Sequence, residues 1–213
     1  MGEERRVTFT YYGGACVVVE VLGYSLVFDP ADFLSDDDIA RLRGPVITLY
    51  TQSLDDHFHE RAAMRLVEMK SSLIVGTSEV CRAVGSFVPS IKLVELQPRR
   101  GFRVGPLRIY AIEGRHEVPT NLYYVTWGPS ILFAGDTGYV QLAKLKADLA
   151  FLPAGGSAFS SPESAHAIAL DVGARYVVPV HCERGEALRL SEMLGSRATT
   201  IIPTPRRPET VTL

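Results

Sequence analysis

Cysteine is scarce in this sequence, and its three cysteines, Cys16, Cys81 and Cys182, lie far apart. Because no two of them form a C-x-x-C pair, the chain has neither a disulfide framework nor a cysteine-based zinc ribbon. The N-terminal run MGEERRVTF lacks the apolar core of a secretory signal. Both absences suit a reducing compartment, and we expect a cytoplasmic protein.

A strong charge of either sign is also missing. The 22 Lys and Arg residues nearly balance the 24 Asp and Glu residues, the formal net charge is -2, and the basic residues are scattered. This pattern lacks the electrostatic footprint of a nucleic-acid-binding protein. No segment approaches the roughly 20 continuous apolar residues that span a membrane. We therefore expect neither nucleic acid nor a membrane as a partner, and no surface pattern predicts an oligomer.

Short apolar runs rich in β-branched and aromatic residues predict most of the strands. These runs fall at Val7–Tyr11, Cys16–Val21, Tyr24–Phe28, 45–51, Leu73–Val75, Leu107–Ile112, Leu122–Trp127, Ile131–Phe133, Leu149–Leu152, Tyr176–Val180 and Thr200–Ile202. The tail from Pro203 to Leu213 ends in Thr-Val-Thr-Leu, which predicts an additional edge strand.

Helices are predicted between these strands from capping residues and helical spacing of apolar residues. They are expected from Ser35 to Gly44, from near Asp56 to Lys70, from Ser78 onward, and near Val140, Pro162 and Glu186. The order is β-rich, then α/β, then β-rich, then α/β again. Two such halves predict an α/β (α+β) fold in which two mixed sheets pack face to face with helices outside. The 213 residues, 46% of them hydrophobic, suit a single domain spanning 1–213.

Histidines and acidic residues follow several of the predicted strands. Metal chemistry needs such residues where strands end, because loops at one rim of a sheet converge there. Only five histidines occur in the chain. The informative segments run from Thr51 to His57, from Glu113 to His116, from Phe133 to Gly138 and from Val178 to His181.

These segments resemble the motifs of the metallo-β-lactamase superfamily, in the family's own order. The motifs are a strand followed by Thr-x-x-x-x-Asp-His, a later His, Gly-Asp-Thr-Gly and Pro-Val-His. The opening Tyr12-Gly13-Gly14-Ala15-Cys16 and the segment Phe28-Asp29-Pro30 resemble the UlaG-like or UPF0173 branch of metal-dependent hydrolases. The resemblance covers nearly the whole chain. It implies a four-layer αβ/βα sandwich and metal-dependent hydrolysis.

The chain departs from the family at half of the metal ligands. The family's second motif reads His-x-His-x-Asp-His, whereas Gln52 and Leu54 replace its first two histidines here. Gly14 stands where the branch usually has another histidine. By position, the first metal site of the family keeps only His116 and the bridging Asp136. We therefore expect that site to be empty, with Gln52 and His116 as its remnant.

The resemblance implies that the second metal site is complete. Its ligands would be Asp56, His57, Asp136 and His181, and two imidazoles with two carboxylates are sufficient for one divalent ion. Zn(II) or Mn(II) is the first expectation, Fe(II) also suits the donors, and a site without metal stays an alternative. A closed tetrahedral shell would make the ion structural.

A more open shell would admit a water molecule that the ion activates as a nucleophile. Asp56 is then the candidate catalytic residue, because it could orient that water or take its proton instead of binding the ion. Asp29 and Thr137 are expected behind the ligands, with Asp29 accepting a hydrogen bond from a ligand histidine.

Each candidate also has a purely structural interpretation. Asp56 and His57 could begin a helix, Asp136 could cap a β-turn, and His116 and His181 could be ordinary loop or rim histidines. Two other histidines, His59 and His166, complete the five of the chain. His59 would replace a lost ligand or point elsewhere on its helix, and His166 is interpreted as structural.

Other nucleophile candidates lack partners in the sequence. Ser157, Ser160 and Ser161 follow Gly155-Gly156, but the pattern places no base for a serine mechanism. Cys182 is interpreted as a small buried apolar residue.

Two functions from different classes remain open. The first is an enzyme that uses one metal ion to activate water against an ester, lactone or phosphodiester in a small molecule. The second is a degenerate module that binds a ligand or partner without hydrolysis, because the partner ion of two-metal hydrolysis is lost. A domain with a purely structural metal lies between them.

Overall fold

The structure is a computed structural model that describes residues 5–213. The first four residues, on which the expectation about a signal segment partly rests, lie outside the described residues. The described chain divides into two compact units. One unit runs up to Gln97 and includes Thr204–Thr212, and the other comprises Pro98–Pro203 and Leu213. A single domain therefore stays a prediction, and each unit is described by itself.

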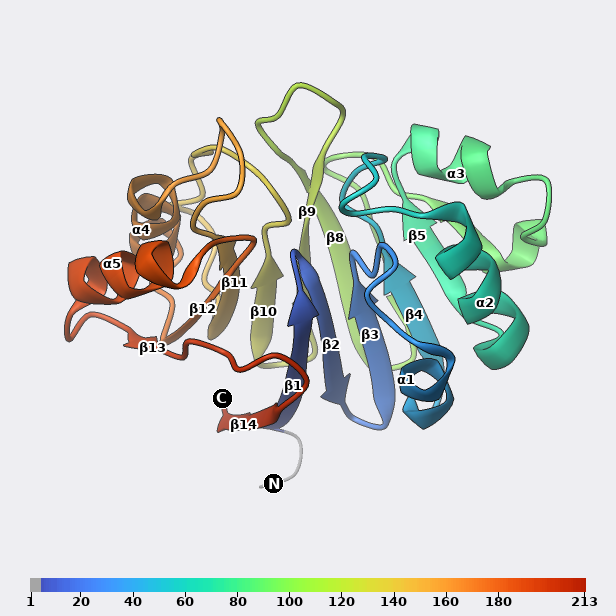
Figure 1. The fold of residues 1–213 in the computed structure, drawn as a ribbon, viewed down its shortest axis with the longest axis horizontal. Helices are drawn as coiled ribbons and strands as arrows, with labels where there is room; N and C mark the ends of the chain where they lie inside the picture. Colours follow the sequence, from blue (N-terminus) through green and yellow to red (C-terminus); the bar gives the residue numbers. More distant parts are fainter. Residues whose placement is uncertain (1–4) are drawn as a thin grey trace. The chain divides into compact units, whose positions relative to one another are not determined.

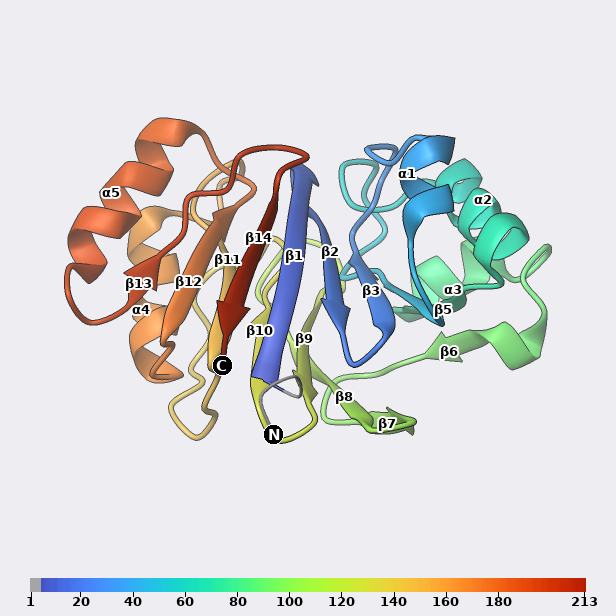
Figure 2. The same cartoon turned by 90° about the horizontal axis from the view of Figure 1, so that it is seen from below.

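The first unit is built on a seven-stranded mixed sheet in the order β14-β1-β2-β3-β4-β5-β6 (Figure 1). Pairing is antiparallel from β14 through β3 and parallel from β3 through β6. The predicted edge strand in the tail is confirmed, because β14 pairs with β1 (Figure 2). The strands are β1 (Arg6–Gly13), β2 (Cys16–Val21), β3 (Tyr24–Phe28), β4 (Val46–Leu49), β5 (Leu73–Gly76), β6 (Leu93–Glu95) and β14 (Pro208–Thr212).

Three helices cover one face of this sheet (Figure 1), namely α1 (Asp36–Arg41), α2 (Glu60–Lys70) and α3 (Ser78–Val84), and a short 3-10 turn spans Ser90–Lys92. Side chains from β2, β3 and β4 pack against α1 and α2, and side chains from β5 pack against α2 and α3. The residues of these two clusters are Cys16, Val18, Val27, Leu34, Ile39, Leu42, Val46 and Leu66, and Tyr50, Phe58, Ala63, Ile74, Val80, Val84 and Val88. The apolar faces of the helices are thus buried against the apolar face of the sheet.

Helix α1 shows how local sequence determines a helix start. Ser35 caps it, since its side chain accepts from the Asp38 backbone N–H while the Asp38 carboxylate accepts from the Ser35 backbone N–H. Burial raises the pKa of Asp38, but hydrogen bonds from Ser35 and Arg206 outweigh it and hold the net pKa below its usual value. The predicted end at Gly44 is wrong. The helix ends at Arg41, because Leu42 turns into an extended conformation and buries its side chain.

The second unit repeats this plan with a seven-stranded sheet in the order β13-β12-β11-β10-β9-β8-β7. Pairing is antiparallel from β7 through β10 and parallel from β10 through β13. The strands are β7 (Gly101–Val104), β8 (Leu107–Glu113), β9 (Asn121–Thr126), β10 (Ser130–Phe133), β11 (Leu149–Pro153), β12 (Tyr176–Val180) and β13 (Thr199–Thr200). Helices α4 (Pro162–Asp171) and α5 (Arg184–Leu194) pack on this sheet (Figure 1).

The helix predicted near Val140 is wrong. Residues 139–145 form a loop, and only one turn closes in it, between the Leu145 N–H and the Leu142 carbonyl. The Asp171 carboxylate accepts from the Tyr139 hydroxyl and from the Leu142 backbone N–H, both at 2.9 Å. The loop is therefore tied by two hydrogen bonds to the end of α4.

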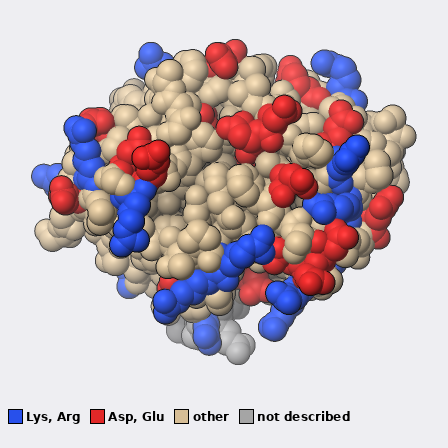
Figure 3. All heavy atoms as spheres, viewed as in Figure 1, with Lys and Arg blue, Asp and Glu red and all other residues tan. Residues whose placement is uncertain are grey.

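Acidic and basic side chains are both spread over the face drawn in Figure 3, in keeping with the scattered charges of the sequence. Among residues 5–213, no helix has the length and apolar character needed to cross a membrane.

Candidate metal centre

In the first unit, the candidate ligands Asp56 and His57 lie in a turn between β4 and α2. The predicted start of the helix near Asp56 is wrong, since α2 begins at Glu60 with His59 as its N-cap. The His57 and Phe58 N–H groups both bond to the Leu54 carbonyl, and the His57 carbonyl accepts from Ala31 at 3.1 Å. The backbone is therefore fixed as a turn before the helix starts. The Asp56 side chain is 55% exposed, whereas the His57 side chain is fully buried.

His57 is held from behind by Asp29. Its Nδ1 lies 2.8 Å from Asp29 Oδ2, and Thr51 adds two bonds to the same carboxylate, from its N–H at 2.6 Å and its hydroxyl at 2.5 Å. All three residues are fully buried. Asp29 also adopts φ +40°, an uncommon conformation for a residue with a side chain. Because Nδ1 donates to Asp29, Nε2 is the ring nitrogen that could bind a metal ion.

The positions where the family's histidines are missing have apolar or buried surroundings. Gly14 adopts φ +53°, and a Cβ there would lie 2.9 Å from the Phe33 ring. A histidine at this position would therefore have to displace Phe33. Gln52 is fully buried, and Leu54 is half-buried.

In the second unit, Asp136 lies in a bend shortly after β10 and is almost fully buried. Its Oδ1 accepts from the Ser157 hydroxyl at 2.9 Å, and its Oδ2 lies 3.2 Å from His116 Nε2. The His116 ring stacks at a tilt against Phe159, with 4.5 Å between ring centroids. The structure thus pairs His116 with Asp136.

Thr137 fixes the loop that carries His116. Its hydroxyl accepts from the Arg115 N–H at 2.7 Å and donates to the Gly138 carbonyl at 2.9 Å. The Gly138 N–H in turn bonds to the Arg115 carbonyl. Thr137 therefore acts through backbone contacts beside both His116 and Asp136.

His181 follows the last residue of β12 in a left-handed conformation, with φ +50°. Its Nδ1 lies 3.2 Å from the Gly155 carbonyl, so this nitrogen carries the ring proton and Nε2 is the ring nitrogen that could bind an ion. Gly156 packs directly against the ring. A Cβ on Gly156 would lie 2.3 Å from His181 Nδ1, so no larger residue fits without moving the histidine.

The loop after β11 belongs to the centre, although the sequence pattern assigns it no role there. Gly155, Gly156 and Ser157 all contact Asp136 or His181. A signal was present, because this loop follows an apolar strand just as the other candidate segments do. The hydroxyl of a serine, however, has too many common roles to be assigned from spacing alone.

The remaining candidates have structural surroundings. Burial and the nearby Glu186 carboxylate raise the pKa of the Cys182 thiol to about 11, so it stays protonated at neutral pH, and it packs against the apolar cluster of the second unit. His59 caps α2 without a side-chain hydrogen bond to the helix, and His166 lies within α4.

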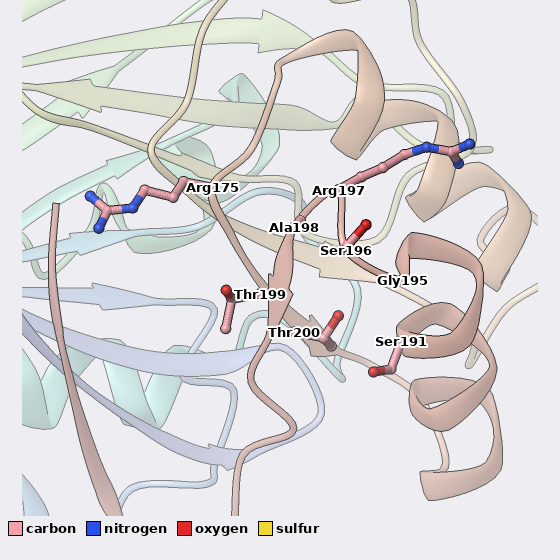
Figure 4. A pocket seen from close by; sticks show the side chains of 8 residues that line it. All are labelled: Arg175, Ser191, Gly195, Ser196, Arg197, Ala198, Thr199 and Thr200. Atoms are coloured by element: carbon pink, nitrogen blue, oxygen red, sulfur yellow. The ribbon is translucent and has the colours of Figure 1, made fainter.

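A separate hollow in the second unit is lined by polar residues near β13 and the end of α5 (Figure 4). Its two arginines, Arg175 and Arg197, extend in opposite directions (Figure 4). Their charges do not converge on one point, in contrast to the side chains around Asp136. The lining residues are Arg175, Ser191, Gly195, Ser196, Arg197, Ala198, Thr199 and Thr200.

Comparison with protein families decides the assignment. The model of the β-lactamase superfamily domain matches residues 8–181. This chain belongs to the metallo-β-lactamase superfamily. A UPF0173 metal-dependent hydrolase of Geobacillus thermodenitrificans is 27% identical over 192 residues, 81% of this chain and 84% of the relative. The UPF0173 metal-dependent hydrolase YtkL of Bacillus subtilis is 25% identical over 193 residues, with coverage of 81% and 84%.

Solved structures confirm the predicted fold class. Igni18, a metallo hydrolase from Ignicoccus hospitalis, superposes with a TM-score of 0.82 at 16% identity and covers 98% of this chain and 99% of its own. The metallo-β-lactamase fold protein YhfI from Bacillus subtilis gives a TM-score of 0.73 at 15% identity, with coverage of 97% and 100%. The chain thus has the metallo-β-lactamase fold, with two seven-stranded mixed sheets.

Proposed function

We propose that this member of the superfamily is a metal-dependent hydrolase that uses one ion, held by Asp56, His57, Asp136 and His181. The observation that carries the proposal is that both histidines are held at the same ring nitrogen. Each donates its Nδ1 proton to a buried acceptor, His57 to Asp29 and His181 to the Gly155 carbonyl. This support leaves Nε2 as the ligand atom in both rings, as is usual for metal-binding histidines.

The donor set fits a divalent ion of intermediate softness. Two imidazoles and two carboxylates suit Zn(II) or Mn(II), and the relatives named as metal-dependent hydrolases support a metal. The second ion of the family has no comparable support in this chain. Gln52 and Leu54 replace two ligands, and we propose that its remnant, Gln52 and His116, holds no ion.

Asp56 is the proposed catalytic residue. A bound ion would polarise an acyl or phosphoryl oxygen and make a water molecule acidic near neutral pH. The Asp56 carboxylate is exposed, so in place of binding the ion it could orient the attacking water and accept its proton. Asp29 keeps the His57 ring fixed during that transfer, and Gly155 does the same for His181. The proposed substrates are small-molecule esters, lactones or phosphodiesters.

Hydrolysis should depend on one equivalent of metal. Chelator-treated protein should be inactive, and titration with Zn(II) or Mn(II) should restore hydrolysis of an activated ester, a lactone or a phosphodiester, with a plateau at one ion per chain. Asp56→Asn should lower kcat by roughly 100-fold or more while metal content stays near one. A plateau at two ions would contradict the single-ion proposal.

A second candidate function is a binding module without catalysis. The loss of two histidines at Gln52 and Leu54 favours it, because two-metal hydrolysis relies on both ions. A metal-loaded protein that hydrolyses no member of the substrate panel would support this candidate.

The three cysteines are unpaired, which supports a reducing compartment such as the cytoplasm for either function.

A further inference from the structure

The loop from Gly155 to Ser160 contacts two of the proposed ligands, although these follow different strands. Asp136 follows β10 and His181 follows β12, while the loop itself follows β11, which lies between those strands in the sheet. The Gly155 carbonyl accepts from His181 Nδ1 at 3.2 Å and from the Ser160 hydroxyl at 2.6 Å. The Ser157 hydroxyl reaches Asp136 Oδ1 at 2.9 Å.

The direction of the Ser157 hydroxyl follows from counting its hydrogen bonds. A serine hydroxyl has one donor hydrogen and two acceptor lone pairs. The Phe159 and Ser160 backbone N–H groups both donate to Ser157 Oγ, at 3.1 and 3.3 Å. Its two lone pairs are therefore used, and its hydrogen must go to an acceptor.

Two acceptors compete for that hydrogen, and Asp136 is the stronger. The Ser160 Oγ lies 3.2 Å away, whereas Asp136 Oδ1 is closer and carries negative charge. The Ser160 hydrogen is itself directed at the Gly155 carbonyl. Ser160 thus links the two ligands, because its N–H donates to Ser157 and its hydroxyl donates to the Gly155 carbonyl, which also accepts from His181.

We propose that Ser157 is a positioning residue that aims the Asp136 carboxylate at the metal ion, within a loop that also fixes the His181 ring. The inference rests on the proposed function, and it adds a residue that the metal motifs do not contain. One oxygen of Asp136 is held by Ser157, which fixes the rotation of the carboxylate. The positions of the two ligands are then coupled, because both depend on the conformation of a single loop.

Metal affinity tests this role directly. Ser157→Ala should weaken Zn(II) binding roughly ten-fold to 100-fold, as measured by competition with a chromophoric chelator. It should also change the visible absorption of the Co(II)-loaded protein, because the ligand geometry changes. Ser157→Thr retains the hydroxyl and should bind metal nearly as tightly as the parent, with the parent's Co(II) spectrum.

Ser161→Ala is the matched control. The Ser161 hydroxyl caps α4 by accepting from the Ser164 N–H, and the loss of this cap should lower stability. Metal affinity and the Co(II) spectrum should not change. Unchanged affinity in Ser157→Ala beside a metal-loaded parent would overturn the inference alone. A parent that takes up neither ion would overturn the proposed function, and the inference with it.

Discussion

Asp29→Asn should weaken metal binding by roughly ten-fold to 100-fold and lower the free energy of unfolding by about 1–3 kcal/mol. The carboxylate accepts three hydrogen bonds in a fully buried site, from the Thr51 N–H, the Thr51 hydroxyl and His57 Nδ1. An amide of the same shape has only one acceptor oxygen. Its NH2 group would then face at least one group that acts as a donor in the parent protein.

The two orientations of the new amide have different consequences. If NH2 replaces Oδ1, it faces the Thr51 N–H, which cannot reverse its role. If NH2 replaces Oδ2, His57 can respond only by accepting at Nδ1, which moves its ring proton to Nε2. That nitrogen is the proposed ligand atom, so metal affinity falls even where the fold survives.

Chelator competition and urea unfolding measure the two effects of Asp29→Asn. Asp38→Asn is the matched control, because Asp38 is also a buried carboxylate but bonds to Ser35 and Arg206 at the start of α1. It should lower stability and leave metal affinity unchanged. If the two variants bound metal equally well, Asp29 would have no role in orienting His57.

Gly156→Ala should cost about 2–4 kcal/mol of stability and at least ten-fold in metal affinity. Gly156 adopts φ +83°, which strains any residue with a side chain. The added Cβ would also lie 2.3 Å from His181 Nδ1 and 2.6 Å from the His181 carbonyl oxygen. The backbone oxygen cannot move aside cheaply, so His181 must leave its position.

Gly173→Ala is the control that separates the effect of backbone strain from the effect of contact with His181. Gly173 also has a positive φ, +56°, but a Cβ there would meet no atom within 4 Å. It should therefore cost only the backbone strain of about 1–2 kcal/mol, with unchanged metal affinity. Thermal unfolding and chelator competition compare the two variants. Equal losses of stability and affinity would show that contact with His181 is unimportant.

Much of the fold could be predicted because its signals are local. Short runs of apolar and β-branched residues identified β2, β3 and β12 with their observed bounds, and Ser35 with the acidic residues after it predicted the start of α1. The failures arose where particular hydrogen bonds of the folded chain, and not the pattern of apolar residues, decide the conformation. Asp171 holds the loop near Val140, and the Leu54 carbonyl binds the turn at His57.

Less of the candidate site than of the fold could be predicted from the sequence. The family's motif order pointed to Asp56, His57, Asp136 and His181, and the family-like segment Phe28-Asp29-Pro30 pointed to Asp29. Ser157 and Gly156 could not be found in this way. Their roles depend on a hydroxyl-to-carboxylate distance and on the space beside an imidazole, which only the folded loop determines.

The metal content of the purified protein tests the central claim most directly. Elemental analysis should find about one equivalent of a divalent ion in protein prepared without chelator, and almost none in Asp136→Ala and His181→Ala. Gln52→Ala should retain its ion, because Gln52 belongs only to the remnant of the first site. Metal near zero in the parent, even after incubation with zinc or manganese, would contradict the account.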